Sequence, residues 1–180
     1  NEYDNLIFLT KKIEKLFINN IKLEIIIVDN GSKDRTNNFL KNYTKSTTLN
    51  IKSLRINKNI GYGYGIMQGI EAATGNTIAW SHADLQTDPN DIILGFQKFK
   101  KYKNNKVILK GKRRNRKIVD VMFTFVMGII CSVTFKTIVS DINAQPKMFN
   151  REFKKYMKQA PFDFSFDLHF LLEAKKNGYK

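Results

Sequence analysis

Short apolar runs alternate along the chain with segments of helical periodicity. The run at 23–28 is rich in β-branched residues, and this run, 51–56, 77–80 and 107–109 are each predicted to be a strand. Between them, apolar positions recur at the spacing of an amphipathic helix. Strands that alternate with helices are typical of an α/β domain with a mostly parallel sheet flanked by helices. The pattern therefore predicts a single α/β domain over residues 1–180.

Polar residues follow the run 77–80 directly, in the order Ser-His-Ala-Asp-Leu-Gln-Thr-Asp-Pro over 81–89. If the pleat of the strand persists, Asp84 and Gln86 point to the same side. Their oxygens suit Mg²⁺ or Mn²⁺, which usually also bind substrate phosphates. Asp88 and Pro89 predict a helix start. Taken alone, this spacing is also typical of a solvated turn.

Two more polar segments follow predicted strands. The first, Asp-Asn-Gly-Ser-Lys-Asp-Arg-Thr over 29–36, comes before a helical pattern, where open α/β sheets bind ligands. The second, at 57–65, is rich in glycine and opens a helix, so its backbone can approach an anionic ligand closely. A tight strand-to-helix turn explains the second segment equally well.

Together these segments resemble the family 2 glycosyltransferases of GT-A fold, and most of all the branch of dolichyl- and polyprenyl-phosphate sugar transferases. The family pattern is Asp-Asp-Gly-Ser-x-Asp-x-Thr, then Asn-x-Gly-x-Gly, then Asp-x-Asp-Leu-Gln-x-Asp-Pro. Segments 29–36, 59–63 and 82–89 match it in order and spacing. Asn30 and His82 replace an Asp of the first and third motifs, so dependence on a metal is less secure than in the family at large.

The resemblance implies a Rossmann-like three-layer fold, with a nucleotide-sugar-binding half over 1–109 and an acceptor-side half over 110–180. It also implies an opening strand before residue 1 and further chain after residue 180. Asp84 and Gln86 would hold Mg²⁺ or Mn²⁺ on the diphosphate, and His82 would hydrogen-bond the donor or support the metal site. The residues expected to bind the donor are Asp29, Asn30, Gly31, Ser32, Gly61, Gly63, His82, Ala83 and Asp84.

The acceptor side begins with a basic run over 110–117. Such a run is commonly a solvated loop, but guanidinium groups also pair with phosphate. Relatives carry Gly-x-Arg-x-x-Arg here, which implies that Arg113 and Arg116, supported by Lys110, neutralise phosphate charge during transfer. The segment 145–147 could form one wall of the active site, or a turn leading into an edge strand.

Two features bear on the acceptor. The apolar stretch 121–133 is shorter than the ~20 residues needed to cross a bilayer, and could be a buried helix or a helix lying in the membrane interface. Asp167 lies eleven residues before Gly178. The resemblance makes it a candidate general base for a hydroxyl acceptor, and N-capping or stabilisation of a helix dipole is the alternative. A polyprenyl phosphate would need no base.

The composition of the chain indicates which kinds of partner it binds. Hydrophobic residues make up 42% of the chain, which indicates a folded domain, and the net charge of +15 predicts anionic partners. These are phosphorylated substrates and acidic lipid; nucleic acid is the weaker choice because no binding motif is present. Abundant surface lysine is the alternative explanation of the charge. The single cysteine, Cys131, fits a reducing compartment.

The sequence therefore predicts an inverting glycosyltransferase. It would move a sugar from a UDP- or GDP-linked donor to polyprenyl phosphate or a glycan, on the cytoplasmic face of a membrane. Two alternatives stay open. One is a non-catalytic nucleotide-sugar-binding module, suggested by Asn30 and His82, and the other is a basic scaffold for nucleic acid.

Overall fold

The computed structural model describes residues 1–16, 22–102, 106–113 and 116–180. Helices and strands alternate along most of the chain, as the apolar pattern predicts. The elements are α1 (Tyr3–Leu16), β1 (Ile25–Asn30), α2 (Thr36–Ser46), β2 (Ile51–Ile56), α3 (Tyr62–Ala72), β3 (Thr77–Trp80), α4 (Asn90–Phe99), β4 (Ile108–Lys110), α5 (Ile118–Thr134), β5 (Lys147–Asn150), a 3₁₀ helix (Arg151–Tyr156) and α6 (Phe166–Lys176).

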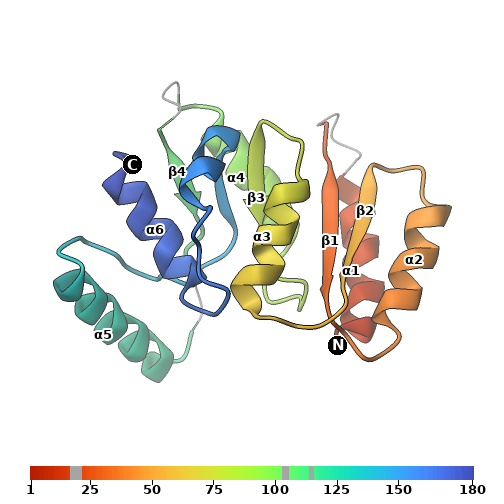
Figure 1. The fold of residues 1–180 in the computed structure, drawn as a ribbon, viewed down its shortest axis with the longest axis horizontal. Helices are drawn as coiled ribbons and strands as arrows, with labels where there is room; N and C mark the ends of the chain where they lie inside the picture. The colour runs from red at the N-terminus through yellow and green to blue at the C-terminus, as the bar shows by residue number, and fades with distance from the viewer. Residues whose placement is uncertain (17–21, 103–105, 114–115) are drawn as a thin grey trace.

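The strands form two ladders (Figure 1). β1 pairs with β2 in parallel, whereas β5 lies between β3 and β4 and is antiparallel to both. β3 and β4 therefore run in the same direction, and β5 is the return strand that the sequence pattern did not reveal. The suggestion that 145–147 leads into an edge strand is wrong, because β5 is central in its sheet.

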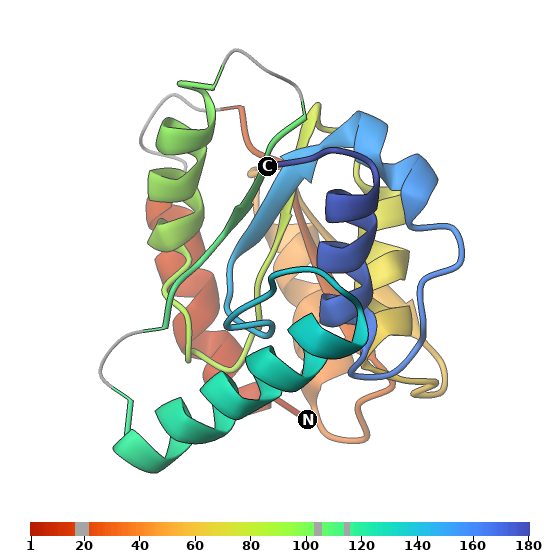
Figure 2. The ribbon, with the colours of Figure 1, turned by 90° about the vertical axis from the view of Figure 1, so that its left-hand side faces the viewer.

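Helices cover both faces of the strands (Figure 2). α1 and α4 lie on one face, and α3 and α6 lie on the other. This three-layer α/β arrangement confirms the predicted fold class. Two of the predicted strands have the expected bounds, and the other two begin one or two residues later than expected.

A cavity of about 820 Å³ separates the two ladders. Apolar side chains of β1 and β3, among them Ile27 and Ile78, line most of it, and no ladder joins these two strands in the described part of the chain. Asn30, Tyr62 and His82 also line the cavity. The carboxyl ends of β1 and β3 thus open onto a shared space.

An aromatic cluster packs α6 onto the second sheet. The ring of Trp80 lies 4.8 Å from that of Phe170, and Phe149 and Phe153 lie 5.6 and 5.1 Å from the same ring. Phe149, Phe153 and Phe170 are fully buried. Edge-to-face packing of this kind adds to the stabilisation from burial itself, so the cluster fixes the first turn of α6 beside β5.

Replacing Phe170 by Ala should destabilise the fold by about 3–5 kcal/mol, because a large cavity would open between α6 and the sheet. Chemical denaturation monitored by circular dichroism measures this change. Phe8→Ala is the matched control, since Phe8 is 60% exposed on α1 and its loss should change stability by no more than about 0.5 kcal/mol. Equal effects of the two substitutions would contradict this description of the core.

Candidate functional site

Asp29, the penultimate residue of β1, has both carboxylate oxygens engaged inside the protein. Oδ1 accepts a hydrogen bond of 2.9 Å from the backbone N–H of Ser32, and Oδ2 forms an ion pair with Arg55. Arg55 also donates to the carbonyl oxygen of Ser32 at 2.8 Å. Asp29 is only 4% exposed. Its first role is therefore to hold the turn that carries Gly31 and Ser32, and its contact with a donor stays a prediction.

The sequence analysis did not single out Arg55. The parallel register places it directly opposite Asp29 on the neighbouring strand. Only the strand pairing reveals this partner, because the two residues lie far apart in the sequence.

Asn30 links the first motif to the glycine-rich segment. Its side-chain amide donates to the carbonyl oxygen of Gly61 at 3.0 Å and to Asn59 Oδ1 at 3.3 Å. Its own Oδ1 is buried without a hydrogen-bond partner in the described structure. A buried unpaired acceptor is costly, so this oxygen is suited to receive a donor group from a ligand.

A close contact within the chain requires glycine at positions 61 and 63. A Cβ on either would lie 2.2 Å from a backbone oxygen of the segment 161–162, and Gly61 has φ of +153°. These glycines let the start of α3 approach another part of the chain closely. Whether they also line the donor site stays a prediction.

The predicted metal motif lies outside the strand. β3 ends at Trp80, and Leu85 has φ of +63°, so the pleat does not persist and the reason given for Asp84 and Gln86 sharing one side is wrong. Asp84 Oδ1 accepts the backbone N–H of Gln86 at 3.0 Å. Its Oδ2 faces His82 Nδ1 at 3.8 Å, while the side chain of Gln86 belongs to an exposed residue. The imidazole of His82, the residue before Ala83, thus points its Nδ1 toward the Asp84 carboxylate.

Tyr62 connects this motif to α6 and to the segment before β5. Its hydroxyl donates to Asp167 Oδ2 at 2.9 Å and lies 3.0 Å from His82 Nε2. Gln145 Nε2 donates to the same hydroxyl at 3.3 Å. Burial, with the negative charge of Asp167 acting in the same direction, raises the pKa of Tyr62 far above its ordinary value, so the hydroxyl stays protonated.

Asp167 forms a buried ion pair with Lys147. Asp167 is 2% exposed in the first turn of α6, and Lys147 is fully buried in β5. The register sets Lys147 opposite Trp80 and Lys110, and its ammonium lies 5.5 Å from the centre of the indole ring. Burial lowers the pKa of Lys147, although the charge of Asp167 opposes this. Ser165 is the N-cap of α6, so the N-cap alternative for Asp167 is wrong.

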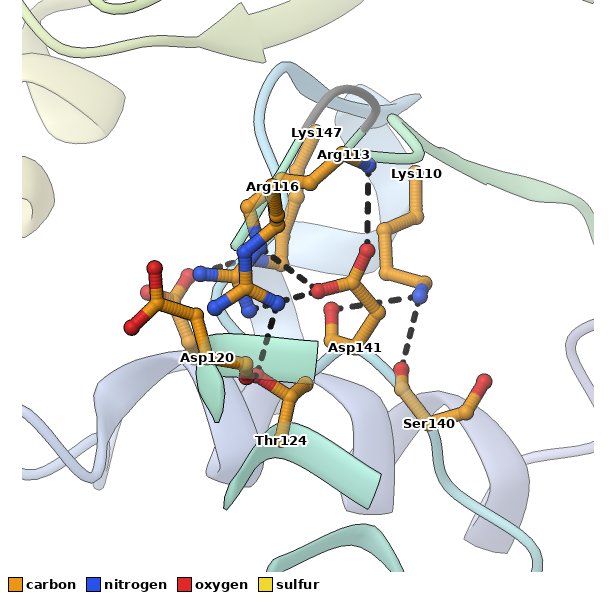
Figure 3. A network of polar contacts seen from close by, with 9 residues as sticks. Lys110, Arg113, Arg116, Asp120, Thr124, Ser140, Asp141 and Lys147 are labelled. Carbon is orange, nitrogen blue, oxygen red and sulfur yellow. Dashed lines mark hydrogen bonds and ion pairs between the residues drawn. The ribbon is translucent and has the colours of Figure 1, made fainter. Parts of the chain in front are cut away.

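Three cations of the basic run have specific partners (Figure 3). Lys110 donates to the carbonyl oxygens of Ser140 and Asp141 at 2.7 and 3.2 Å. Arg113 binds the Asp141 carboxylate through Nε at 2.7 Å, and Arg116 donates to Thr124 Oγ1 at 2.7 Å. These three side chains therefore have partners within the protein, although Arg113 is exposed in a loop.

Lys110, Arg113, Arg116 and Asp141 form a cluster of charges. The surroundings of Asp141 and Lys110 in this cluster shift their pKa values. Burial alone would raise the pKa of Asp141, but the hydrogen bonds and positive charge of Arg113 hold it below its ordinary value. Burial lowers the pKa of Lys110, and the nearby Arg113 adds to this effect. The cluster carries more positive than negative charge, which suits a phosphate group.

The exit of the chain from β4 is fixed by backbone contact. Gly111 N–H donates to the carbonyl oxygen of Pro146 at 2.8 Å. A Cβ on Gly111 would lie 2.0 Å from the carbonyl oxygen of Gln145. The basic run therefore leaves β4 directly beside the segment that leads into β5.

A divalent cation at the motif 82–86 stays a prediction. No group of three or more His, Cys, Asp or Glu able to hold a metal occurs among the described residues. Asp84 and His82 together offer one carboxylate oxygen and one ring nitrogen. Two protein ligands are typical of cations that complete their coordination with substrate phosphates and water, and imidazole suits Mn²⁺ better than Mg²⁺.

Comparison with known proteins identifies the class. The model of Glycosyl transferase family 2 matches residues 1–163, so the chain belongs to that family. Over 94 residues it is 33% identical to a dodecaprenyl-phosphate galacturonate synthase of Rhizobium johnstonii, covering 52% of this chain and 27% of that protein. Over 69 residues it is 36% identical to an undecaprenyl-phosphate 4-deoxy-4-formamido-L-arabinose transferase of Pectobacterium carotovorum, covering 38% and 21%. The matches thus span about a quarter of these relatives.

Two solved structures show the same fold. The mannosyltransferase PcManGT from Pyrobaculum calidifontis, in complex with GDP-Man and Mn²⁺, has a TM-score of 0.67 and 16% identity, covering 96% of this chain and 49% of that one. TarS of S. aureus has the same TM-score and identity, covering 97% and 52%. The fold is that of the GT-A glycosyltransferases, as predicted.

Removing one member of the Lys147–Asp167 pair should destabilise the fold strongly. Lys147→Met and Asp167→Asn should each lose about 3–5 kcal/mol, because each leaves the other charge buried without its partner. The double variant should recover more than half of the summed loss. Chemical denaturation of all four proteins gives this coupling energy.

Lys12→Met is the matched control, because Lys12 and Asp88 form an ion pair whose side chains are 45% and 51% exposed. Its effect should not exceed about 1 kcal/mol. Additive losses in the double variant would show that the two buried groups do not act as a pair.

Proposed function

We propose that this chain forms the donor- and acceptor-binding part of an enzyme that moves a sugar from a nucleotide diphosphate to a polyprenyl phosphate. The reaction takes place on the cytoplasmic face of a membrane and inverts the sugar's anomeric carbon. Family membership supports sugar transfer, and both curated relatives are named for polyprenyl-phosphate products or acceptors.

The observation that carries the choice of acceptor is the exposed apolar surface of α5. Of its residues only Gly128 and Cys131 are buried, so the buried-helix interpretation is wrong. No helix in the described part of the chain is long and apolar enough to span a membrane. The exposed apolar residues of α5 are Ile118, Val119, Val121, Met122, Phe123, Phe125, Val126, Met127, Ile129, Ile130 and Val133.

α5 lies at the end of the molecule where β1 terminates (Figure 1), and Arg116 binds Thr124 on this helix. An apolar helix beside basic side chains is the arrangement expected of a protein that lies on an anionic lipid surface. The helix could thus bring the lipid tail to the membrane while Lys110, Arg113 and Arg116 meet its phosphate.

The donor would bind at the carboxyl ends of β1 and β3. Asn30 offers its unpaired Oδ1, Asp29 supports the turn 29–32, and Asp84 with Gln86 or His82 would hold a divalent cation. Such a cation acts as a Lewis acid on the departing diphosphate. Positive charge at Arg113 and Arg116 would stabilise the phosphate charge that builds during transfer.

The contacts of the Asp167 carboxylate with Lys147 and Tyr62 favour a phosphate acceptor. A sugar hydroxyl needs a base that it can reach, whereas Asp167 is 2% exposed and its two oxygens contact Lys147 and Tyr62. A phosphate monoester has a pKa near ~6 and is mostly dianionic at neutral pH, so it is already nucleophilic. The same observation counts against a glycan acceptor activated by Asp167, and family membership counts against a nucleic-acid scaffold.

Transfer from UDP- and GDP-linked sugars should occur to undecaprenyl phosphate in vesicles and not to undecaprenol, which lacks only the phosphate. Product formation is measured by thin-layer chromatography of the labelled lipid. Equal transfer to the alcohol would contradict the proposal that the acceptor is a polyprenyl phosphate. Donor binding without transfer to any acceptor would support the non-catalytic module instead.

In the same assay, Arg113→Gln should slow transfer by about 10²–10³, the usual effect of removing a group that stabilises developing charge. Lys41→Gln is the control, because Lys41 is exposed on α2. A steep loss of activity with both variants would point to a general dependence on charge and not to a phosphate site.

The double variant Phe123→Asp/Phe125→Asp should bind anionic phospholipid vesicles at least about tenfold more weakly, since each phenylalanine withdrawn from lipid loses about 1.5–3 kcal/mol. Vesicle sedimentation measures the bound fraction. Phe8→Asp on α1, equally exposed, should bind like the unaltered protein. Unchanged binding of the α5 variant would exclude this helix as the lipid contact.

A further inference from the structure

We propose that Asp141 is a positioning residue for Arg113. Its carboxylate holds one edge of the guanidinium group and thereby presents the other edge to the phosphate of a polyprenyl-phosphate acceptor. This inference rests on the proposed function, in which Arg113 meets that phosphate, and it assigns a role to the acidic member of the charge cluster.

Asp141 contacts both the side chain and the main chain of Arg113 (Figure 3). Its Oδ1 accepts a hydrogen bond of 2.7 Å from Arg113 Nε and lies 2.5 Å from Nη2. Its Oδ2 accepts the backbone N–H of Arg113 at 3.1 Å. The carboxylate therefore fixes both the place of Arg113 in the loop after β4 and the direction of its guanidinium group.

These contacts leave one edge of the guanidinium group open to a ligand. The group carries five N–H donors in one plane, and a phosphate commonly pairs with two of them at once. Asp141 takes the edge formed by Nε and Nη2. Nη1 has no hydrogen-bond partner among the residues that the structure describes, and the side chain of Arg113 is 34% exposed. A phosphate can thus reach Nη1 and the second hydrogen of Nη2 without displacing Asp141.

The main chain at Asp141 holds a second cation. The carbonyl oxygens of Ser140 and Asp141 accept hydrogen bonds from the Lys110 ammonium group at 2.7 and 3.2 Å. Asp141 has φ of +43°, a left-handed conformation that aspartate and asparagine adopt more readily than most residues. One residue thus contacts Lys110 through its carbonyl and Arg113 through its carboxylate, which keeps the two cations side by side.

Two effects of Asp141 on a bound phosphate oppose each other. Holding Arg113 in advance favours binding, because the rotational freedom of its long side chain is lost on folding and not when the phosphate binds. The negative charge of Asp141 disfavours binding, because it repels a phosphate dianion. The side chains of Arg113 and Asp141 are 34% and 20% exposed, so water and salt weaken this repulsion. Positioning should therefore dominate, and removal of the carboxylate should weaken binding.

The first test measures binding of farnesyl phosphate, a short polyprenyl phosphate, to the full chain by isothermal titration calorimetry. Asp141→Asn should bind it at least about tenfold more weakly, because the guanidinium group is no longer held in advance. Asparagine keeps the size of the side chain and tolerates the positive φ. Thermal melting of the variant verifies that it is folded.

Asp120→Asn is the matched control for the loss of charge. Asp120 is an exposed residue in the first turn of α5, near the same cluster (Figure 3). Its substitution removes the same negative charge without touching the contacts of Arg113. The affinity for farnesyl phosphate should change less than about threefold, because solvent screens a charge at the surface.

The second test is independent of how well Asp141→Asn folds. Arg113→Ala should transfer sugar to undecaprenyl phosphate slowly. Added guanidinium chloride should restore its rate by at least about tenfold, because Asp141 can hold the free cation where the side chain stood. Sodium chloride at the same concentration should restore nothing. The double variant Arg113→Ala/Asp141→Asn should show no rescue by guanidinium.

Unchanged or tighter binding of farnesyl phosphate by Asp141→Asn would overturn the inference, and tighter binding would show that Asp141 competes with the phosphate for Arg113. Equal rescue of the single and double variants, or no binding of farnesyl phosphate by the unaltered protein, would also overturn it. Sugar transfer to undecaprenyl phosphate alongside any of these results would leave the proposed function standing. The expected loss of binding in a protein that transfers no sugar would support the positioning role and contradict the proposed function.

Discussion

The buried ion pair between Lys147 and Asp167 is the constraint on which the arrangement of the site depends. An ammonium group inside a sheet is strongly unfavourable unless an opposite charge meets it. The aromatic cluster around Trp80 and Phe170 holds the first turn of α6 against β5, and this contact brings Asp167 to Lys147. Packing and charge thus specify the same position for α6.

From this pair, polar contacts extend in two directions. Toward the donor side, Asp167 holds Tyr62, and Tyr62 holds His82 at the end of β3. Toward the acceptor side, Lys147 lies opposite Lys110 in the ladder, where the basic cluster begins. Residues before and after position 110 are therefore joined by a set of contacts centred on the buried Lys147 and Asp167. Such a connection keeps groups from distant parts of the sequence in fixed relation, which is what a reaction between two substrates requires.

The strands at 51–56 and 77–80 were predicted with their observed bounds. Buried isoleucines mark both ends of the first, and the second alternates between buried and partly buried positions. A strand after 145–147 was offered as an alternative, but the central position of β5 was not predicted, because the strand is short and begins with a lysine. Nothing in a chain with 31 basic residues distinguishes Lys147 from a surface lysine; only its place in the sheet does. The periodicity of 121–133 could not decide between a buried and an exposed helix, because lipid and protein interior select the same side chains.

The motifs located the candidate site, but not its internal contacts. Asp29 and Asp167 stood out as chemically useful carboxylates, yet the partners that engage them, Arg55 and Lys147, come from neighbouring strands. Register and packing create those pairings, and neither is visible in local sequence. The contact of the glycines at 61 and 63 with the segment 161–162 was likewise not visible in the local sequence.

The close approach of Gly111 to the carbonyl of Gln145 has a consequence for how this surface could diversify. No side chain fits at position 111, so the path of the main chain out of β4 is invariant as long as β5 keeps its place. New acceptor preferences would then have to arise by substituting side chains near this turn, such as Arg113. The main-chain path of the turn itself would stay the same.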